Sequence, residues 1–239
     1  MPDFNRNSGD SVETIRSVRV VPRSYRSLTG HFASRLGPSI QFESSLERDF
    51  LTRYDFDLSV QRIVSQPCRV LYTQENGRQG HYTPDFLVIY RQDPPQSDRP
   101  RPLAMLVEVK PSEDWRKHWR KWSRKWMAAR RYALQRGWIF RIMDESRIRD
   151  ERLANINYLN RYRRSAVTAD VCARLLLGLG ARGPSTVGSI LKEYFGGCDE
   201  SAALIHVWHL VATRQLDANV DEPLTTKTVL WVPDVKRSL

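Results

Sequence analysis

Apolar and polar residues alternate in patterns that predict strands and helices over most of the chain. The apolar run at residues 103–110 is typical of a buried strand, and Pro111 ends it because proline has no N–H to donate. A second strand is expected over residues 80–90, with its pairing interrupted where Pro84 precedes Asp85. The other elements expected in this half are a helix over residues 45–54, strands over 68–73 and 138–143, and a hairpin turn at Asn76-Gly77.

The segment after Pro111 has the period of a long helix that starts at Ser112. Trp115, Trp119, Trp122 and Trp126 recur every three or four residues and therefore fall on one stripe, which predicts that they pack the helix onto a sheet. Stacking of these rings on unpaired bases is the alternative. Six basic residues fall largely on the other side, where phosphate contact is favoured over simple solvation: Arg116, Lys117, Arg120, Lys121, Arg124 and Lys125.

The C-terminal third has a different pattern. Apolar periodicity predicts helices over residues 169–177, 185–195 and 200–212, followed by two short strands over 216–220 and 228–232. Three helices and a β-hairpin form a winged-helix pattern, and a charged helix over 147–164 is expected to lead into it. The predicted organisation is a basic N-terminal arm at 1–38, a catalytic domain at 39–164 and a winged-helix-like, partner-binding domain at 165–239.

Charge and composition limit the possible functions. The 239 residues are 41% hydrophobic and carry a net charge of +11. From residue 165 onward there are seven Lys and Arg against eight Asp and Glu, so the first 164 residues hold 31 against 19, a net +12. This excess predicts binding to a phosphate backbone. The odd number of cysteines and the lack of a long apolar stretch predict a cytoplasmic protein that does not bind a membrane.

Three carboxylates and a lysine indicate metal-dependent hydrolysis. Glu108 and Lys110 lie two residues apart and so project from the same face of their strand, and Asp85 lies in the neighbouring one. Mg²⁺ prefers oxygen ligands, which Asp85, Glu108 and the Val109 carbonyl would supply, while Lys110 would position the attacking water. Glu47 would complete a second metal position, so two Mg²⁺ ions are expected, with Mn²⁺ as a possible substitute.

Each of these assignments has a structural alternative. Ser44-x-x-Glu47 is also a capping box at a helix start, and Glu43 is a rival for the same metal position. Glu108 and Lys110 would otherwise form an exposed ion pair of little consequence. Cys198, His206 and His209 suggest zinc, but no fourth ligand is evident, and an ordinary helix face is favoured.

Three segments together resemble a known family. Residues 42–50 (FESSLERDF), 81–86 (HYTPDF) and 107–111 (VEVKP) are similar to those of TnsA-like endonucleases, the nicking subunits of heteromeric transposases. The Pro84-Asp85 and Glu108-Val109-Lys110 pattern is shared more widely with restriction-endonuclease-like nucleases. The resemblance covers about residues 29–144 and implies an α/β (α+β) core in which helices flank a mixed sheet. One departure is that some family members have Gln where Glu108 stands, so Asp85 and Lys110 are the safer assignments.

The resemblance also implies a reaction and partners. Glu47, Asp85, Glu108 and Lys110 would inherit the catalytic roles, and the chain would nick the 5′ strands of double-stranded DNA at transposon ends. A DDE-type transposase subunit, TnsB, would cut and join the 3′ strands, and an AAA+ ATPase regulator, TnsC, would bind the C-terminal domain. The alternatives are a stand-alone restriction or repair endonuclease and a non-catalytic DNA-binding adaptor.

Overall fold

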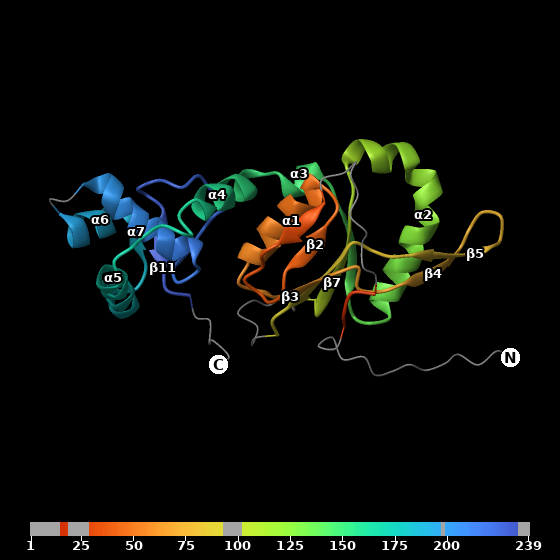
Figure 1. Cartoon of the computed structure of the whole chain (residues 1–239), viewed down its shortest axis with the longest axis horizontal. Coiled ribbons are helices and arrows are strands. Elements are labelled where there is room, and N and C mark those ends of the chain that lie inside the picture. The colour runs from red at the N-terminus through yellow and green to blue at the C-terminus, as the bar shows by residue number, and fades with distance from the viewer. Residues whose placement is uncertain (1–14, 19–28, 93–101, 197–198, 234–239) are drawn as a thin grey trace. The chain divides into compact units, whose positions relative to one another are not determined.

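The computed structural model describes residues 15–18, 29–92, 102–196 and 199–233 (Figure 1). The chain divides between Ile148 and Arg149 into two compact units. In the described ranges, no helix combines the length and the apolar character needed to cross a membrane.

A four-stranded mixed sheet forms the centre of the first unit. Its strands are β3 (Val60–Ser65), β6 (Phe86–Tyr90), β7 (Ala104–Val109) and β8 (Ile139–Met143), in that order across the sheet. β6 runs antiparallel to β3 and β7, whereas β8 is parallel to β7. Since Phe86 pairs with Val107, the start of β6 lies beside the end of β7, and the expected site residues meet at one edge of the sheet.

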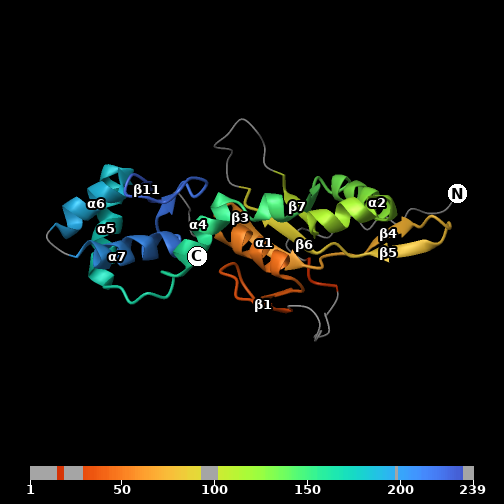
Figure 2. The same ribbon diagram turned by 90° about the horizontal axis from the view of Figure 1, so that it is seen from above.

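Two helices cover opposite faces of this sheet (Figure 2). In α1 (Ser45–Phe56), the Phe50 ring stacks on the Phe86 ring with centroids 5.2 Å apart. The neighbouring Leu87 points the other way, into a buried cluster with Trp126 of α2 (Ser112–Leu134). The first unit is therefore an α+β domain with a mixed sheet flanked by helices, as expected for a restriction-endonuclease-like nuclease core.

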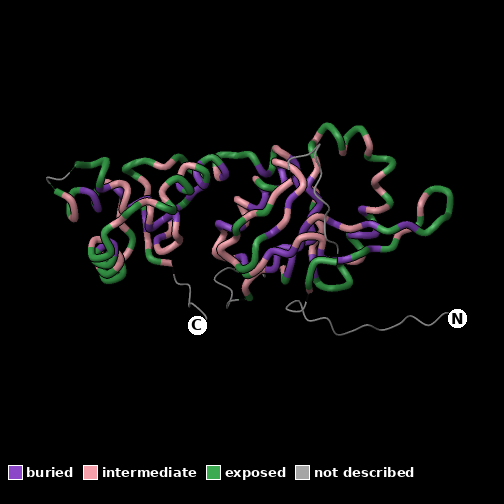
Figure 3. The backbone as a smooth tube through the Cα atoms, viewed as in Figure 1, coloured by how far each residue is buried: buried purple, intermediate pink, exposed green. Residues whose placement is uncertain are grey.

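The two halves of α2 differ in burial. Trp126 is only 3% exposed, but Trp119 is 51% exposed, and Trp115 and Trp122 are half-buried. Exposed and half-buried residues line the first half of the helix, and buried ones first appear at Trp126 (Figure 3). The expectation that all four tryptophans pack on the sheet is therefore wrong for Trp119, which is half exposed, whereas Trp115, Trp122 and Trp126 pack in or against the core cluster.

The smaller strands complete the first unit. β4 (Val70–Thr73) and β5 (Gln79–Tyr82) form the expected hairpin, and Gly77 adopts a φ of 77° in its turn. The predicted strand over residues 80–90 is split into β5 and β6, with Pro84 between them. β3 was not predicted, because a register shift between Val60 and Arg62 obscures its alternation.

Part of the expected N-terminal arm belongs to the fold. β1 (Gly30–Phe32) pairs antiparallel with β2 (Ile40–Phe42) across the predicted boundary at 38/39. The Arg35 backbone N–H donates to the Asp55 carboxylate over 2.9 Å. Residues 1–14 and 19–28 of the arm lie outside the described residues.

The described residues of the second unit form four helices and a small sheet, and they follow the short α3 (Glu145–Ile148) that ends the first unit. The described elements of this unit are α4 (Glu151–Asn160), α5 (Ala169–Arg182), β9 (Ser185–Thr186), α6 (Val187–Phe195), α7 (Glu200–Ala212), β10 (Asp217–Ala218) and β11 (Val229–Trp231). The sheet has the order β10-β11-β9, with β11 antiparallel to both neighbours. The element order follows the predicted one, with β9 added; the winged-helix assignment stays a prediction.

The helix expected to bridge the domains belongs to the second unit. Asn155 in α4 is buried, and its Nδ2 donates to the carbonyl oxygens of Val220 and Glu222 over 3.1 and 2.8 Å. These bonds join α4 to the segment after β10, so the division falls before α4 rather than at the expected 164/165. No sequence pattern indicates this pairing, because its partners are about 65 residues apart.

Candidate active site

Asp85 is tied to the end of the neighbouring strand. Its backbone N–H donates to the Val107 carbonyl over 3.0 Å, and its Oδ2 accepts from the Val109 N–H over 2.7 Å. The Lys110 N–H in turn donates to Met143 of β8 over 3.0 Å. Backbone pairing thus holds the Asp85 carboxylate beside the Glu108-Val109-Lys110 segment that the sequence predicted to work with it.

Glu108 is buried among donors. It is 1% exposed; its Oε2 accepts from the Tyr82 hydroxyl over 2.6 Å. Its Oε1 lies 3.3 Å from Lys125 Nζ and 3.7 Å from Lys110 Nζ. The alternative of an exposed ion pair is therefore wrong, since the carboxylate is enclosed and shared by two ammonium groups and a phenol.

Lys125 occupies a different place from the one its helix pattern predicted. Its ammonium lies 4.6 Å from the Tyr82 ring centroid, 5.1 Å from that of Trp122 and 5.7 Å from that of Trp126. Such distances allow cation–π attraction, which helps to hold the charge beside Glu108. The sequence did contain a signal, because Lys125 follows Trp122 by three residues and precedes the buried Ala129 by four.

Tyr82 was not identified from the sequence as a site residue. It is 6% exposed, and burial, followed by the nearby Glu108 charge, raises the pKa of its hydroxyl well above the usual value. The hydroxyl therefore stays protonated and remains a donor to Glu108. Its place in the quoted HYTPDF segment was the available signal.

The other predicted DNA-contacting residues do lie at the surface. Arg116, Lys117, Arg120, Lys121 and Arg124 are all exposed along α2. The half-exposed Trp119 lies in the same part of the helix. This part of the helix thus offers separate positive charges and an aromatic surface to a polyanion.

Glu47 performs the capping role that was its structural alternative. The Ser44 hydroxyl caps α1 by accepting from the Glu47 N–H over 3.1 Å, and Glu47 Oε2 accepts from the Glu43 N–H over 2.8 Å. The carboxylate is 9% exposed, and burial raises its pKa. Glu47 therefore fixes the start of α1 while it faces the site.

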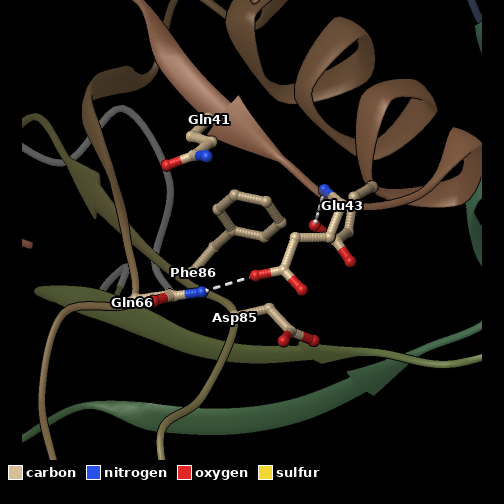
Figure 4. A pocket seen from close by; sticks show the side chains of 6 residues that line it. Gln41, Glu43, Gln66, Asp85 and Phe86 are labelled. Carbon is tan, nitrogen blue, oxygen red and sulfur yellow. Dashed lines mark hydrogen bonds between the residues drawn. The ribbon is translucent and has the colours of Figure 1, made fainter. Parts of the chain in front are cut away.

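A pocket joins this helix start to Asp85. It is lined by Gln41, Glu43, Glu47, Gln66, Asp85 and Phe86 (Figure 4). Glu43, the rival for the third carboxylate, lies in this pocket, and its Oε1 accepts from Gln66 Nε2 over 2.9 Å. The structure therefore brings Glu43 and Glu47 together with Asp85, whereas Glu108 is not among the lining residues.

Burial and neighbouring charges shift the pKa values of Asp85 and Lys110. Burial, followed by the Glu108 charge, raises the pKa of Asp85 well above its usual value. Burial alone would lower the pKa of Lys110, but the charges of Asp85, Glu108, Glu47 and Glu43 outweigh it and raise that pKa. Lys110 is thus held as an ammonium, whereas burial and the Glu108 charge disfavour the ionised form of Asp85.

The donors suit a hard divalent cation. The carboxylates of the pocket and of Glu108 supply oxygen, the ligand type that Mg²⁺ and Mn²⁺ prefer, and added positive charge would stabilise ionised Asp85. Within the ranges described, no three His, Cys, Asp or Glu side chains gather into a ready set of metal ligands. The carboxylates are instead engaged in the hydrogen bonds given above.

The residues that suggested zinc serve the packing of the second unit. His206 Nε2 accepts from the Thr168 N–H over 3.2 Å, and His209 Nδ1 lies 3.0 Å from the Tyr162 carbonyl oxygen. Cys198 lies outside the described residues. The contacts of both histidines thus agree with the favoured interpretation of an ordinary helix face.

Comparison with known proteins finds one family whose model matches part of the chain. Residues 57–145 match the family model described as TnsA-like endonuclease N terminal. No curated protein matches the chain. The matched range includes Asp85, Glu108 and Lys110. It begins directly after helix α1, so it does not include Glu47.

Proposed function

We propose that this chain is a Mg²⁺-dependent endonuclease that nicks the 5′ strands at transposon ends. The match of residues 57–145 to the TnsA-like endonuclease family supports a nuclease role in transposition. The observation that carries the proposal is the pairing of Asp85 with the Glu108-Val109-Lys110 segment inside the matched range. A carboxylate pair and a retained ammonium at adjoining strand ends suit phosphodiester hydrolysis.

The side chains have distinct roles in this proposal. Asp85 and Glu108, with the Val109 carbonyl, would hold Mg²⁺ or Mn²⁺, and Glu47 would contribute to a second ion. The metal would supply Lewis-acid stabilisation of charge on the phosphate oxygens. Lys110, whose pKa is raised by the surrounding carboxylates, stays charged and so acts by orienting water and the phosphate rather than by removing a proton.

The exposed basic side of α2 would contact the DNA backbone. Arg116, Lys117, Arg120, Lys121 and Arg124 would add salt-dependent affinity without choosing a sequence. Choice of the transposon end would then come from the partners. We propose TnsB, a DDE-type transposase, as the subunit that cuts the 3′ strands.

The second unit is proposed to bind the AAA+ regulator TnsC. Its helix α7 contains no Lys or Arg, and residues 149–239 are nearly neutral, with 12 Lys and Arg against 10 Asp and Glu. A broad phosphate footprint is not expected from such a surface. Removing residues 149–239 should therefore weaken binding to the ATPase more than binding to DNA; the opposite result would contradict this assignment.

The decisive experiment is strand-specific nicking of a labelled transposon-end duplex in Mg²⁺ with the cognate transposase and ATPase. Asp85→Ala and Lys110→Ala should each reduce the 5′-strand cut by about 100-fold or more while the 3′ cut persists. Glu75→Gln, at an exposed position in the β4–β5 turn, is the matched control and should cut at the native rate.

The same assay separates the alternatives. Native cutting by Asp85→Ala would make the chain a DNA-binding adaptor. Sequence-specific cutting by the isolated chain, without either partner, would indicate a stand-alone restriction or repair enzyme. Loss of the 5′ cut alone in both variants would establish the proposed role.

A further inference from the structure

Gln66 has a backbone conformation that is unfavourable for its residue type. It directly follows β3 and adopts a φ of 47°, in the left-handed region; among the described residues, the only other non-glycine with positive φ is Arg214. A Cβ atom in this region meets the neighbouring carbonyl, so the conformation persists only where surrounding contacts enforce it. Strain of this kind concentrates at functional sites, and Gln66 lies at the pocket that contains Asp85.

The contacts that enforce the conformation lead to Asp85. The Gln66 backbone N–H donates to the Asp85 carbonyl oxygen over 2.7 Å, and the Gln66 carbonyl accepts from the Val18 N–H over 3.0 Å. Ser65, just before it, pairs with Phe86, just after Asp85. The strained residue therefore anchors the backbone of the residue on which the proposed nuclease site depends.

The side chain of Gln66 also belongs to the site. Its Nε2 donates to Glu43 Oε1 over 2.9 Å, and the residue lines the pocket with Asp85 and Glu47 (Figure 4). Its Oε1 is buried and has no hydrogen-bond partner in the described part of the chain. A buried acceptor without a donor is unfavourable, so this residue tolerates two separate penalties beside the same pocket.

We propose that Gln66 is a positioning residue of the nuclease site. Its backbone fixes Asp85, and its amide holds the Glu43 carboxylate at the pocket wall. Fold stability alone would favour glycine at this position, which relieves the φ strain and removes the unpaired acceptor. The inference rests on the proposed nuclease function and adds Gln66, with Glu43, to the residues on which that function depends.

Substitution by glycine and by asparagine tests the proposal in the full chain. Gln66→Gly should raise the melting temperature measured without divalent cations by about 2–4 °C, because the strain is relieved. It should lower the rate of the 5′ nick by about tenfold, as is typical when a supporting partner of a site residue is lost. Gln66→Asn tolerates the left-handed backbone but is one methylene shorter, so it should lose the bond to Glu43 and also nick more slowly.

The matched control is Gln79→Gly on the exposed strand β5. Glycine weakens a strand, so this variant should lower the melting temperature and leave nicking at the native rate. The two glycine variants should therefore move stability in opposite directions, and only Gln66→Gly should affect nicking. A purely structural Gln66 would lose stability together with activity.

Each remaining outcome contradicts the inference. Native nicking by Gln66→Gly, or a melting temperature that falls as in Gln79→Gly, would remove Gln66 from the site. Asp85→Ala in the same assay shows which proposal has failed. If Asp85→Ala still cuts, the nuclease function itself is wrong; if Asp85→Ala is inactive and Gln66→Gly cuts normally, only the positioning role is wrong.

Discussion

Asp85 and Glu108 lie at the ends of adjacent strands, but their surroundings differ. Both oxygens of Glu108 have donors or cations close by, namely Tyr82, Lys125 and Lys110. Asp85 faces a pocket with two further carboxylates, and its pKa is raised by burial and then by the Glu108 charge. The chain thus surrounds Glu108 with cations and donors, whereas Asp85 has the Val109 N–H and the charge of Lys110 but also faces like charges. Under the proposed function, Asp85 is therefore the carboxylate that depends more on a bound cation.

The largest expected difference is in nicking by the two amide variants. Asp85→Asn should reduce the rate of the 5′ nick by about 100-fold or more, because it removes the negative charge with which Asp85 would bind the metal ion. Glu108→Gln should reduce it by only about tenfold, because the amide keeps an oxygen and the site keeps both lysines. Strand-specific nicking rates measure both effects. Equal losses would remove the distinction between the two carboxylates.

Cation binding without DNA should depend on the same residue. Mg²⁺ at about 100 times its dissociation constant should stabilise the native chain by about 2.7 kcal/mol, measured by denaturant unfolding. Asp85→Asn should lose this gain, and Glu108→Gln should retain most of it. If Asp85→Asn were stabilised as much as the native chain, the ion would bind elsewhere.

Replacing Lys125 tests whether its positive charge is needed to offset the buried charge of Glu108. Lys125→Met keeps the apolar stem among the aromatic rings but removes a charge 3.3 Å from buried Glu108, which should destabilise the fold by about 1–2 kcal/mol. Lys121→Met removes an exposed lysine one turn earlier and should change stability by less than about 0.5 kcal/mol. Unfolding free energies at low salt compare the two. Similar values would mean that Lys125 is not needed to balance Glu108.

The smallest effect is a dependence of stability on pH. Because the folded-state pKa of Asp85 is raised, its contribution to stability is present below its usual pKa and is lost as pH rises through the raised value. Without divalent cations, Asp85→Asn should therefore be more stable than the native chain at pH 8, and the difference should shrink toward about pH 4. Melting temperatures across this range provide the measurement. A difference that stayed constant with pH would contradict the raised pKa.

The sequence alone determined the elements that carry the site. The apolar run before Pro111 predicts β7, Asn76-Gly77 predicts the β4–β5 hairpin, and the three- and four-residue spacing of tryptophans predicts α2. These features depend on neighbouring residues, so periodicity and turn chemistry are sufficient to find them. The side-by-side position of Glu108 and Lys110 follows from strand alternation in the same way.

Tertiary structure decided how the side chains are used. Lys125 turns inward because the Tyr82 ring and Glu108, far away in sequence, lie against its helix. Gln66 becomes a pocket residue only because β3 pairs with β6 and brings it to Asp85. Such contacts join residues that lie outside the reach of a single helix or strand. Local patterns do not encode which of the compatible partners a side chain meets, since that depends on how strands and helices pack in three dimensions.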